Sequence, residues 1–440
     1  MKLDLLFKDS KGVKVPERKY SEDKDLEVFP LPKEVIIPMA QHLGAPAKIV
    51  VGKGDTVKTG QLIGEASGFI SANIHSTVSG EVKKIIQLVN VVTSQPMDAI
   101  VIESDGKDTW SKMKKINNFE SKDDKELLTR IKDAGIVGLG GATFPTNVKL
   151  SPPPGKNIDT IILNGCECEP YITSDHRVML EYGKEILTGL RVMMKLLSCD
   201  NVFIGIENNK PDAIDKMGNL VSDMGLEGVK IAQLKSKYPM GAEKTLTKNL
   251  LGREVPIGGL PLDVGVVVQN VGTVKAIYDA IYEGLALVER AITVTGLVKE
   301  PKNLIVRFGT PAIDLINYCG GVIDDADEMI FGGPMMGLSQ YNLSTPTIKG
   351  TNCILLKKAN IIDESSCIRC SSCIDACPMD LMPTMYVSFV KKKRYEDCDL
   401  YFVDNCVECG ACAYSCPAKI PIVQYIKIAK NELRKQRVKK

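Results

Sequence analysis

Eight cysteines near the C-terminal end constrain this chain more than any other feature. They form two runs with the same spacing, C-x₂-C-x₂-C-x₃-C-P. That spacing is typical of proteins with two [4Fe–4S] clusters, in which the fourth cysteine of each run binds the other cluster. Structural zinc sites also use pairs of cysteines separated by two other residues, so a zinc site is the alternative interpretation. Zinc sites rarely have three cysteines plus Cys-Pro in each run, so two iron–sulfur clusters are the preferred interpretation.

The crossing of the fourth cysteine divides the eight predicted ligands between two clusters. Cluster 1 takes Cys367, Cys370, Cys373 and Cys416, and cluster 2 takes Cys406, Cys409, Cys412 and Cys377. Two neighbouring clusters carry one electron at a time. The chain therefore needs an electron donor and an acceptor, and we expect its remaining domains to supply one of them.

Composition limits the cellular setting and the partners. The chain has 440 residues, of which 44% are hydrophobic, and a net charge of +2, as expected for several soluble domains without a basic surface for nucleic acid. No apolar run reaches the length of a transmembrane helix, and the first residues lack the apolar core of a signal peptide. We therefore expect a protein on the cytoplasmic side, where its 14 cysteines stay free of disulfides.

The residue pattern changes several times and predicts a multidomain α/β protein. Short β-branched runs between glycine turns predict an all-β module, and alternating strands and helices (174–197 among the helices) predict a Rossmann-like parallel sheet. The predicted units are an irregular arm (1–30), the all-β module (31–106), the parallel α/β domain (126–284), a small α+β domain (285–350), the cysteine domain (355–420) and a basic C-terminal helix (421–440).

A glycine-rich loop opens the predicted α/β domain. It contains Gly138, Gly140 and Gly141, and Lys149 follows a few residues later. Glycines allow backbone N–H groups to approach a phosphate, and a lysine adds a positive charge. Tight-turn glycines are the alternative interpretation.

Polar side chains follow three predicted strands of the same domain. They are Asn164, Glu167 and Glu169 after the first, Tyr238, Gly241 and Glu243 after the second, and Asn270 and Thr273 after the third. Open α/β sheets bind ligands at the carboxyl ends of their strands. Taken singly, each carboxylate is as easily a solvated acid or a helix cap. Because the same chain carries two predicted clusters that transfer electrons, the whole set favours a nucleotide cofactor.

These motifs resemble a known family. Gly138-x-Gly140-Gly141-Ala142-x-Phe144-Pro145-Thr146, Asn164-x-x-Glu167-x-Glu169-Pro170, Gly241-Ala242-Glu243 and Asn270-x-x-Thr273 resemble the flavin and NADH site of the NADH-oxidising subunit of respiratory complex I. Two clusters and an N-terminal β module, with the segments 31–46 and 74–80, resemble the C subunit of the Rnf complex, the ion-translocating ferredoxin:NAD⁺ oxidoreductase.

The resemblance implies a fold and a set of roles. The all-β module would be a barrel sandwich of the biotinyl/lipoyl type, the α+β unit a β-grasp (SLBB-like) domain, and the cysteine domain ferredoxin-like and helical. FMN, held non-covalently, would have its phosphate near Gly138, Gly140, Gly141, Lys149, Asn270 and Thr273, and its ring near Asn164 and Glu167, with Tyr238 and Gly241 also in the site. Phe144 would stack on NAD(H), and Glu169 and Glu243 would contact its polar groups as the catalytic pair. One position departs from the family pattern: the corresponding loop of the complex I subunit has an arginine where this chain has Leu139.

The resemblance also implies a function. The chain would be a peripheral oxidoreductase subunit at the cytoplasmic face of the membrane, exchanging hydride between NAD(H) and FMN and passing single electrons through two [4Fe–4S] clusters. Its partners would be integral-membrane Rnf subunits, which carry the ion, and a ferredoxin-like B subunit, with ferredoxin acting indirectly. The alternatives are a soluble flavin and iron–sulfur NADH reductase of the cobalamin reductase type and a non-enzymatic electron-carrying scaffold.

The cysteine assignment predicts the effect of single substitutions on iron content. Two [4Fe–4S] clusters hold about eight iron atoms, and loss of one ligand should remove about four of them. Cys370→Ala should therefore lower the iron content by about half, whereas Cys398→Ala, outside both runs, should leave it unchanged. Metal analysis of the purified variants measures this, and stoichiometric zinc without iron would establish the alternative.

Overall fold

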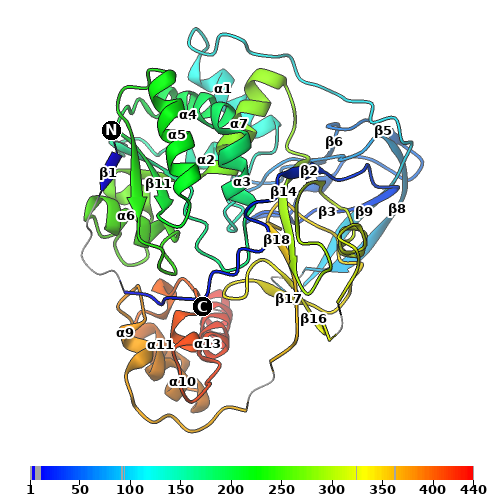
Figure 1. The fold of residues 1–440 in the computed structure, drawn as a ribbon. Helices are drawn as coiled ribbons and strands as arrows, with labels where there is room; N and C mark the ends of the chain where they lie inside the picture. Colours follow the sequence, from blue (N-terminus) through cyan, green and yellow to red (C-terminus); the bar gives the residue numbers. More distant parts are fainter. Residues whose placement is uncertain are drawn as a thin grey trace.

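A five-stranded parallel sheet forms the centre of one domain in this computed structural model (Figure 1). The structure describes residues 2–4, 11–90, 93, 95–323, 325–360 and 363–439. The strand order is β1 (Lys2–Asp4), β12 (Val229–Leu234), β11 (Val202–Glu207), β10 (Thr160–Asn164) and β13 (Val266–Asn270). All neighbouring strands run parallel. The parallel α/β sheet expected from strand–helix alternation is confirmed.

Helices cover both faces of this sheet. Ile161 and Leu163 of β10 pack into one core, and Ile162 between them packs into the core on the other face. Strands buried on both sides are typical of parallel sheets. The helical elements of this domain are α1 (Asp124–Asp133), α2 (Thr146–Lys149), α3 (Ser174–Glu181), α4 (Gly183–Leu197), α5 (Pro211–Asp223), α6 (Glu243–Leu251), η1 (Pro261–Val264), α7 (Val271–Tyr278) and the π-helical turn η2 (Asp279–Glu283).

The barrel domain consists of two small antiparallel sheets. Its strands are β3 (Glu34–Pro38), β9 (Pro96–Ser104), β8 (Gly80–Val89) and β5 (Thr56–Val57) in one sheet and β4 (Lys48–Ile49), β6 (Leu62–Glu65) and β7 (Ile74–His75) in the other. Val35, Ile63 and Ile100 belong to the core that both sheets share. The all-β module is confirmed.

A mixed sheet of six strands forms the next domain. Its order is β17 (Leu338–Gln340), β16 (Glu328–Phe331), β18 (Cys353–Lys357), β14 (Glu289–Gly296), β15 (Lys302–Arg307) and β2 (Leu26–Val28), and α8 (Ala312–Tyr318) packs against it. Ile292, Leu304 and Leu315 lie in its core. An α+β unit was expected for this part of the chain, and the structure agrees.

The N-terminal arm is more ordered than its charged sequence predicts. Its residues 2–4 form β1 at the edge of the parallel sheet, and residues 26–28 form β2 at the edge of the mixed sheet. Between them, Val13 bridges to Tyr238. The arm lacks a helical or alternating pattern because its order comes from strands and loops far away in the sequence.

The single helix predicted over 174–197 is wrong. The structure has two helices, α3 and α4, separated at Tyr182, whose φ of −119° and ψ of 26° are not helical. Gly183 begins the second helix, and a Cβ atom there would lie 2.6 Å from Leu220 Cδ1 of α5. The apolar positions kept helical spacing across the break, so periodicity alone did not reveal it.

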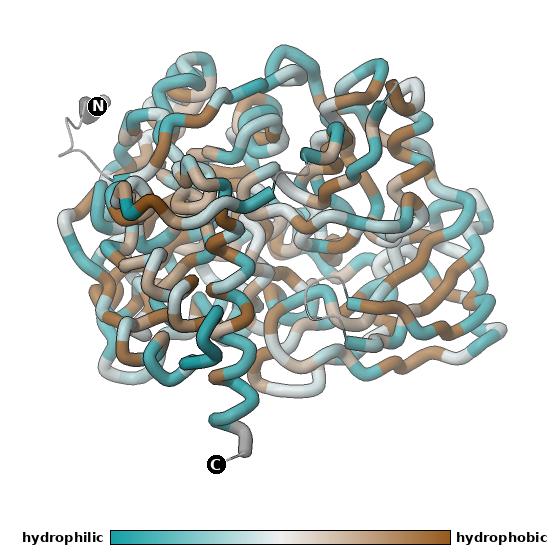
Figure 2. Tube along the Cα trace, turned by 90° about the horizontal axis from the view of Figure 1, so that it is seen from below, coloured by the Kyte–Doolittle hydropathy of each residue, from teal (hydrophilic) through white to brown (hydrophobic). Residues whose placement is uncertain are grey.

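The C-terminal cysteine domain (residues 363–439) is helical. It contains α9 (Ser372–Asp375), α10 (Pro383–Lys391), α11 (Tyr395–Leu400), the 3₁₀ turn η3 (Val403–Asn405), α12 (Ala411–Tyr414) and α13 (Ile422–Lys439). The last turns of α13 project from the body and are largely hydrophilic (Figure 2). Lys430 pairs with Glu408, and Arg437 pairs with Asp399 and Asp404, while the basic residue Lys440 lies outside the described residues. In the part of the chain described, no helix has the length and apolarity needed to cross a membrane.

Substitution by alanine should have opposite effects on stability at two helical glycines, Gly189 and Gly218. A Cβ atom at Gly189 of α4 would lie 2.3 Å from Val274 O of α7, so Gly189→Ala should destabilise the fold by about 1–3 kcal/mol. At Gly218 of α5 the nearest atom would be Ile231 Cγ1 at 3.8 Å, so Gly218→Ala should stabilise by up to about 1 kcal/mol. Thermal unfolding of both variants measures this, and shifts of equal sign would contradict the packing described.

Candidate functional site

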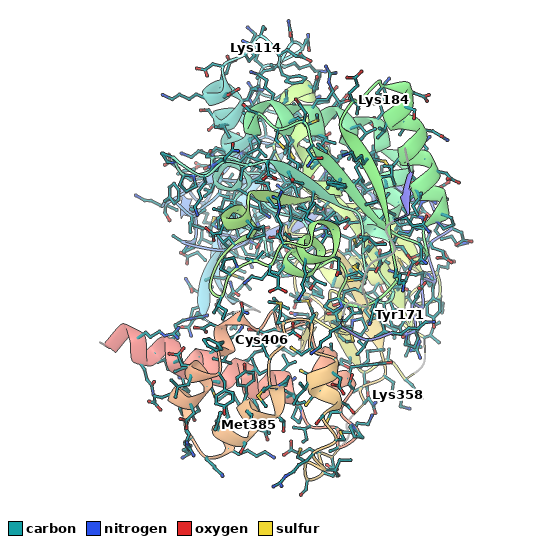
Figure 3. The ribbon with its side chains drawn as sticks, turned by 90° about the vertical axis from the view of Figure 1, so that its left-hand side faces the viewer. Lys114, Tyr171, Lys184, Lys358, Met385 and Cys406 are labelled. Carbon is teal, nitrogen blue, oxygen red and sulfur yellow. The ribbon has the colours of Figure 1, made fainter. Side chains whose placement is uncertain are left out.

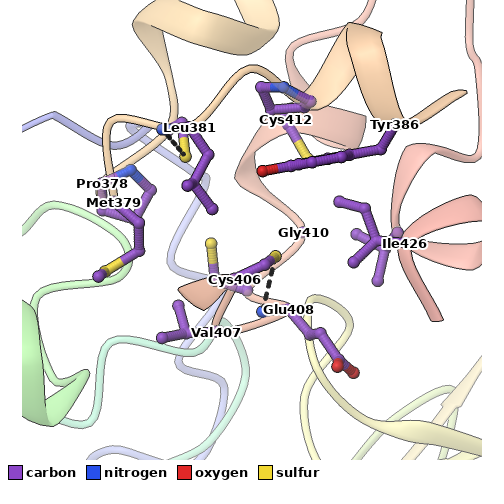
Figure 4. A pocket seen from close by; sticks show the side chains of 14 residues that line it. Pro378, Met379, Leu381, Tyr386, Cys406, Val407, Glu408, Gly410, Cys412 and Ile426 are labelled. Carbon is purple, nitrogen blue, oxygen red and sulfur yellow. Dashed lines mark hydrogen bonds between the residues drawn. The ribbon is translucent and has the colours of Figure 1, made fainter. Parts of the chain in front are cut away.

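Four cysteines from the two runs line one pocket in the cysteine domain. Cys377, Cys406, Cys409 and Cys412 surround it, together with Leu381, Tyr386 and Ile426 among other residues (Figure 4). These are the four cysteines predicted to hold cluster 2. The backbone N–H of Leu381 donates to Cys377 Sγ and that of Glu408 donates to Cys406 Sγ, each at 3.4 Å. Amide donors to sulfur are one of the means by which proteins set cluster potentials.

The cysteines predicted for cluster 1 lie nearer the surface. Cys367 and Cys370 are exposed, Cys373 is half-buried and Cys416 is buried. Burial raises the pKa of Cys373, and the nearby thiols Cys416 and Cys367 raise it further, so members of both runs meet here as well. Within the residues described, no group of three or more His, Cys, Asp or Glu side chains can hold a single metal ion. An enclosed pocket lined by four sulfurs fits a larger cluster better than a zinc ion.

The glycine loop has the features of a phosphate site. Gly141 has a φ of +119°, which favours glycine, and a Cβ atom there would meet nothing within 4 Å. Among the residues described, no partner is found for the backbone N–H groups of Gly140, Gly141 and Ala142. Free amide donors beside open space, with Lys149 nearby, suit an anionic phosphate. The residues present therefore fit the phosphate end of FMN.

Direct contacts join two of the three strand-end loops. Asn164 Nδ2 donates to Gly241 O at 2.8 Å and joins the first loop to the second. Lys149 and Glu243 form an ion pair, in which 20% of the Lys149 side chain and 43% of the Glu243 side chain are exposed. The structure thus brings together α2, which follows the glycine loop, and the loops after β10 and β12, and their side chains remain partly exposed to solvent. Phe144 is half-buried in the same loop.

Asn270 and Thr273 hold this region in place through their own hydrogen bonds. Asn270 Oδ1 accepts from the amides of Gly272 and Thr273 and caps α7, while Asn270 Nδ2 donates to Asp175 Oδ2 at 2.6 Å. Thr273 Oγ1 accepts from the amide of Leu139 at 2.8 Å. Thr273 therefore holds the glycine loop directly, and Asn270 caps the start of the helix that carries Thr273.

Glu167 and Glu169 point to different partners. The Glu167 carboxylate accepts from the amides of Asp175 and His176 and so caps α3. The Glu169 carboxylate accepts from the amides of Met335 and Met336, at 3.2 and 2.8 Å, in the mixed-sheet domain. Glu169 is therefore engaged away from the Lys149–Glu243 pair. Its predicted contact with NAD(H) stays a prediction.

Tyr238 lies between the parallel sheet and the cysteine domain. Its side chain is 2% exposed, and its hydroxyl donates to Cys409 O at 2.6 Å. Val13 of the arm, Cys168, Met335 and Val407 pack around it. Figure 3 shows Cys406 on the side of the cysteine domain that faces the rest of the molecule. Tyr238, predicted to bind cofactor, thus joins a strand-end loop of the parallel sheet to the cysteines predicted for cluster 2.

Sequence reasoning missed Arg290 and Asp175. Arg290 of β14 is 6% exposed and donates to Leu139 O at 2.9 Å and to Lys349 O at 2.7 Å. Burial lowers its pKa to about 10, and the charges of Asp175 and Glu167 oppose that shift. A cation thus reaches Leu139 from another domain. No motif marks Arg290, because its strand has the sequence of an ordinary β-strand.

The buried Glu169 predicts a pH dependence of stability. Burial raises its pKa from 4.5 to about 7, although the amides of Met335 and Met336 oppose this. The folded protein thus keeps a proton that the unfolded chain releases, so stability is highest below pH 4.5 and is lost as the pH rises through 7, by about 3 kcal/mol. Urea unfolding between pH 5 and 8 should show a weaker pH dependence for Glu169→Gln. The exposed control Glu227→Gln should keep the wild-type dependence, and equal slopes for all three proteins would contradict the prediction.

Comparisons with known proteins match each part of this architecture. Family models match the RnfC barrel sandwich hybrid domain at residues 7–107, the Nuo51 FMN-binding domain at 131–279, the SLBB domain at 291–339 and the 4Fe-4S dicluster domain at 366–420. A chain from a crystal structure of NAD+-reducing [NiFe]-hydrogenase has the same fold over part of its length. Its TM-score is 0.51 at 16% identity, covering 70% of this chain and 63% of that one.

Curated relatives are similar over most of the chain. The C subunit of the proton-translocating ferredoxin:NAD(+) oxidoreductase complex of Clostridium ljungdahlii is 48% identical over 387 residues, covering 86% of this chain and 83% of that protein. The C subunit of the Na(+)-translocating complex of Acetobacterium woodii is 41% identical over 395 residues, covering 88% of each. The resemblance drawn from the motifs is confirmed, and the chain belongs to the family of C subunits of ion-translocating ferredoxin:NAD(+) oxidoreductase complexes.

Proposed function

We propose that this chain is the subunit that exchanges electrons with NAD(H) in a membrane-associated ferredoxin:NAD⁺ oxidoreductase complex. Bound FMN supplies the conversion between hydride transfer and single-electron transfer. The observation that carries the proposal is the contact at Tyr238, which joins the nucleotide loops to the pocket of four cysteines through its hydrogen bond to Cys409 O. A nucleotide site without a nearby electron acceptor would not need this junction.

The chain's own residues have distinct tasks in this proposal. The free amides of the glycine loop and the Lys149 ammonium bind the FMN phosphate, Thr273 holds that loop against α7, and Asn270 caps α7. Asn164 fixes the second strand-end loop, which carries Gly241 and Glu243. Glu243, partly exposed beside Lys149, is the carboxylate best placed to meet a polar group of NAD(H).

The proposed ligand sets give the two clusters an order. Cluster 2 would lie beside Tyr238 and the nucleotide loops, because Cys409 contacts that side. Cluster 1 would face outward, because Cys367 and Cys370 are exposed. Cys367 and Cys370 would thus hold a cluster on the side open to a ferredoxin-like partner subunit, and Cys409 would help to hold the other beside the nucleotide loops; when bound, the clusters would supply single-electron transfer.

The proposal includes a peripheral position on the cytoplasmic face of the membrane. Ion transport would belong to integral-membrane partner subunits of the complex, as in the ion-translocating complexes for which the relatives are named. Lys427 and Arg434 of α13 have no acidic partner among the residues described, so this helix offers positive charge to anionic lipid or to an acidic subunit. No nucleic-acid partner is proposed.

An anaerobic NADH titration of the iron- and FMN-loaded chain tests the function. NADH should bleach the flavin absorbance, and low-temperature EPR should then show reduced clusters. Glu243→Ala should lose most of the reduction by NADH while keeping reduction by dithionite. The exposed residue Glu254 serves as the control in Glu254→Ala. Clusters that respond to dithionite but never to NADH would overturn the proposal for the isolated chain.

A further inference from the structure

The loop that carries Asn164, Glu167 and Glu169 is irregular, and its backbone carbonyls are not paired within a helix or strand. Glu167 adopts a left-handed φ of +47°, and Tyr171 a φ of +71°. A buried loop of this kind needs partners for its carbonyl groups, because an unpaired buried carbonyl is costly. Two lysine side chains supply those partners.

Lys19 of the N-terminal arm binds three carbonyls of this loop. Its Nζ donates to Glu167 O and Glu169 O, both at 2.9 Å, and to Ile172 O at 2.6 Å. An ammonium group has three protons, so all its donors are used on this one loop. Before it reaches Lys19, the arm passes near Val13 between the parallel-sheet domain and the cysteine domain (Figure 1).

Lys210 holds the preceding part of the loop from the other side. Its Nζ donates to Cys166 O at 2.7 Å and pairs with Glu207 at 3.3 Å, and both side chains are almost fully buried. Lys210 therefore has its own counter-ion. By contrast, within the described residues no carboxylate lies within ion-pair distance of Lys19, so its positive charge stays uncompensated by a direct partner.

Neighbouring contacts fix the arm so that Lys19 stays in place. The Tyr171 amide donates to Glu17 O at 2.9 Å, and Ser21 Oγ and Thr173 Oγ1 are hydrogen-bonded at 2.8 Å. On the N-terminal side, Val13 pairs with Tyr238. The backbone is thus fixed both before and after Lys19, and this positions the ammonium group against the loop.

We propose that Lys19 is the positioning residue of the flavin site. It sets the conformation of the loop from Glu167 to Ile172, and it places a positive charge, which has no direct ion-pair partner among the described residues, behind the loop that carries the predicted flavin-lining residues. This inference rests on the proposed function, because it assigns Lys19 a role toward FMN. It predicts that loss of the ammonium weakens FMN binding and disfavours additional negative charge in the site.

The test uses the full chain with its clusters reconstituted and FMN as the titrant. Fluorescence titration should give Lys19→Met an FMN Kd at least about tenfold higher than wild type, the effect of losing hydrogen bonds from a charged group. Lys19→Arg, which keeps the charge, should recover much of the affinity. Lys24→Met on the exposed part of the same arm is the matched control and should bind like wild type. Iron content should be equal in all four proteins.

A second readout separates charge from simple structural support. At saturating FMN, spectroelectrochemistry should give Lys19→Met a more negative flavin midpoint potential than wild type, with Lys19→Arg close to wild type. Lys19→Gln, which keeps hydrogen-bond donors without the charge, decides the matter if Lys19→Met does not fold. Wild-type affinity and potential in a folded Lys19→Met or Lys19→Gln protein would overturn the inference. Failure of the wild type to bind FMN would instead overturn the proposed function.

Discussion

The contact between Tyr238 and Cys409 is the constraint on which the functional architecture depends. The two residues are 171 positions apart, and a buried hydroxyl-to-carbonyl hydrogen bond of 2.6 Å joins them. Each end belongs to a chemically specialised loop, one at the carboxyl edge of a parallel sheet and one between cysteines of the second run. Electron exchange between a nucleotide and a cluster requires these loops to be neighbours. The apolar packing of Val13, Cys168 and Val407 around Tyr238 keeps them so.

Buried cations organise the nucleotide region from outside its own domain. Arg290 comes from the mixed sheet and Lys19 from the N-terminal arm, and both bind backbone carbonyls of loops that we propose to bind the nucleotide. A cation that binds a backbone carbonyl fixes the path of a loop without occupying its amide donors. The glycine loop illustrates this, since Leu139 O is bound to Arg290 while the next amides have no partner in the part of the chain that the structure describes. The site is thus completed by segments that carry no recognisable motif.

Local spacing predicted a large part of this arrangement. The two cysteine runs predicted a division of eight ligands between two clusters, and Cys377, Cys406, Cys409 and Cys412, predicted for one of them, line one pocket. The strand ends converged because parallel strands have their carboxyl ends at one edge. The hydrogen-bond partners of individual side chains could not be predicted from the sequence. Asn270 and Glu167 serve as helix caps, and Glu169 binds the amides of Met335 and Met336, because each carboxylate or amide takes the nearest unpaired donor that the fold provides.

The sequence by itself determined the domain types, the cluster-type cysteine spacing and the family, because each depends on residues close together in the chain. Only the tertiary structure decided the order of the arm, the break between α3 and α4, and the placement of Lys19, Arg290 and Tyr238. Those features depend on contacts between distant segments. A lysine in a charged arm has the same local pattern whether it faces water or binds three buried carbonyls, so only the packed chain distinguishes the two.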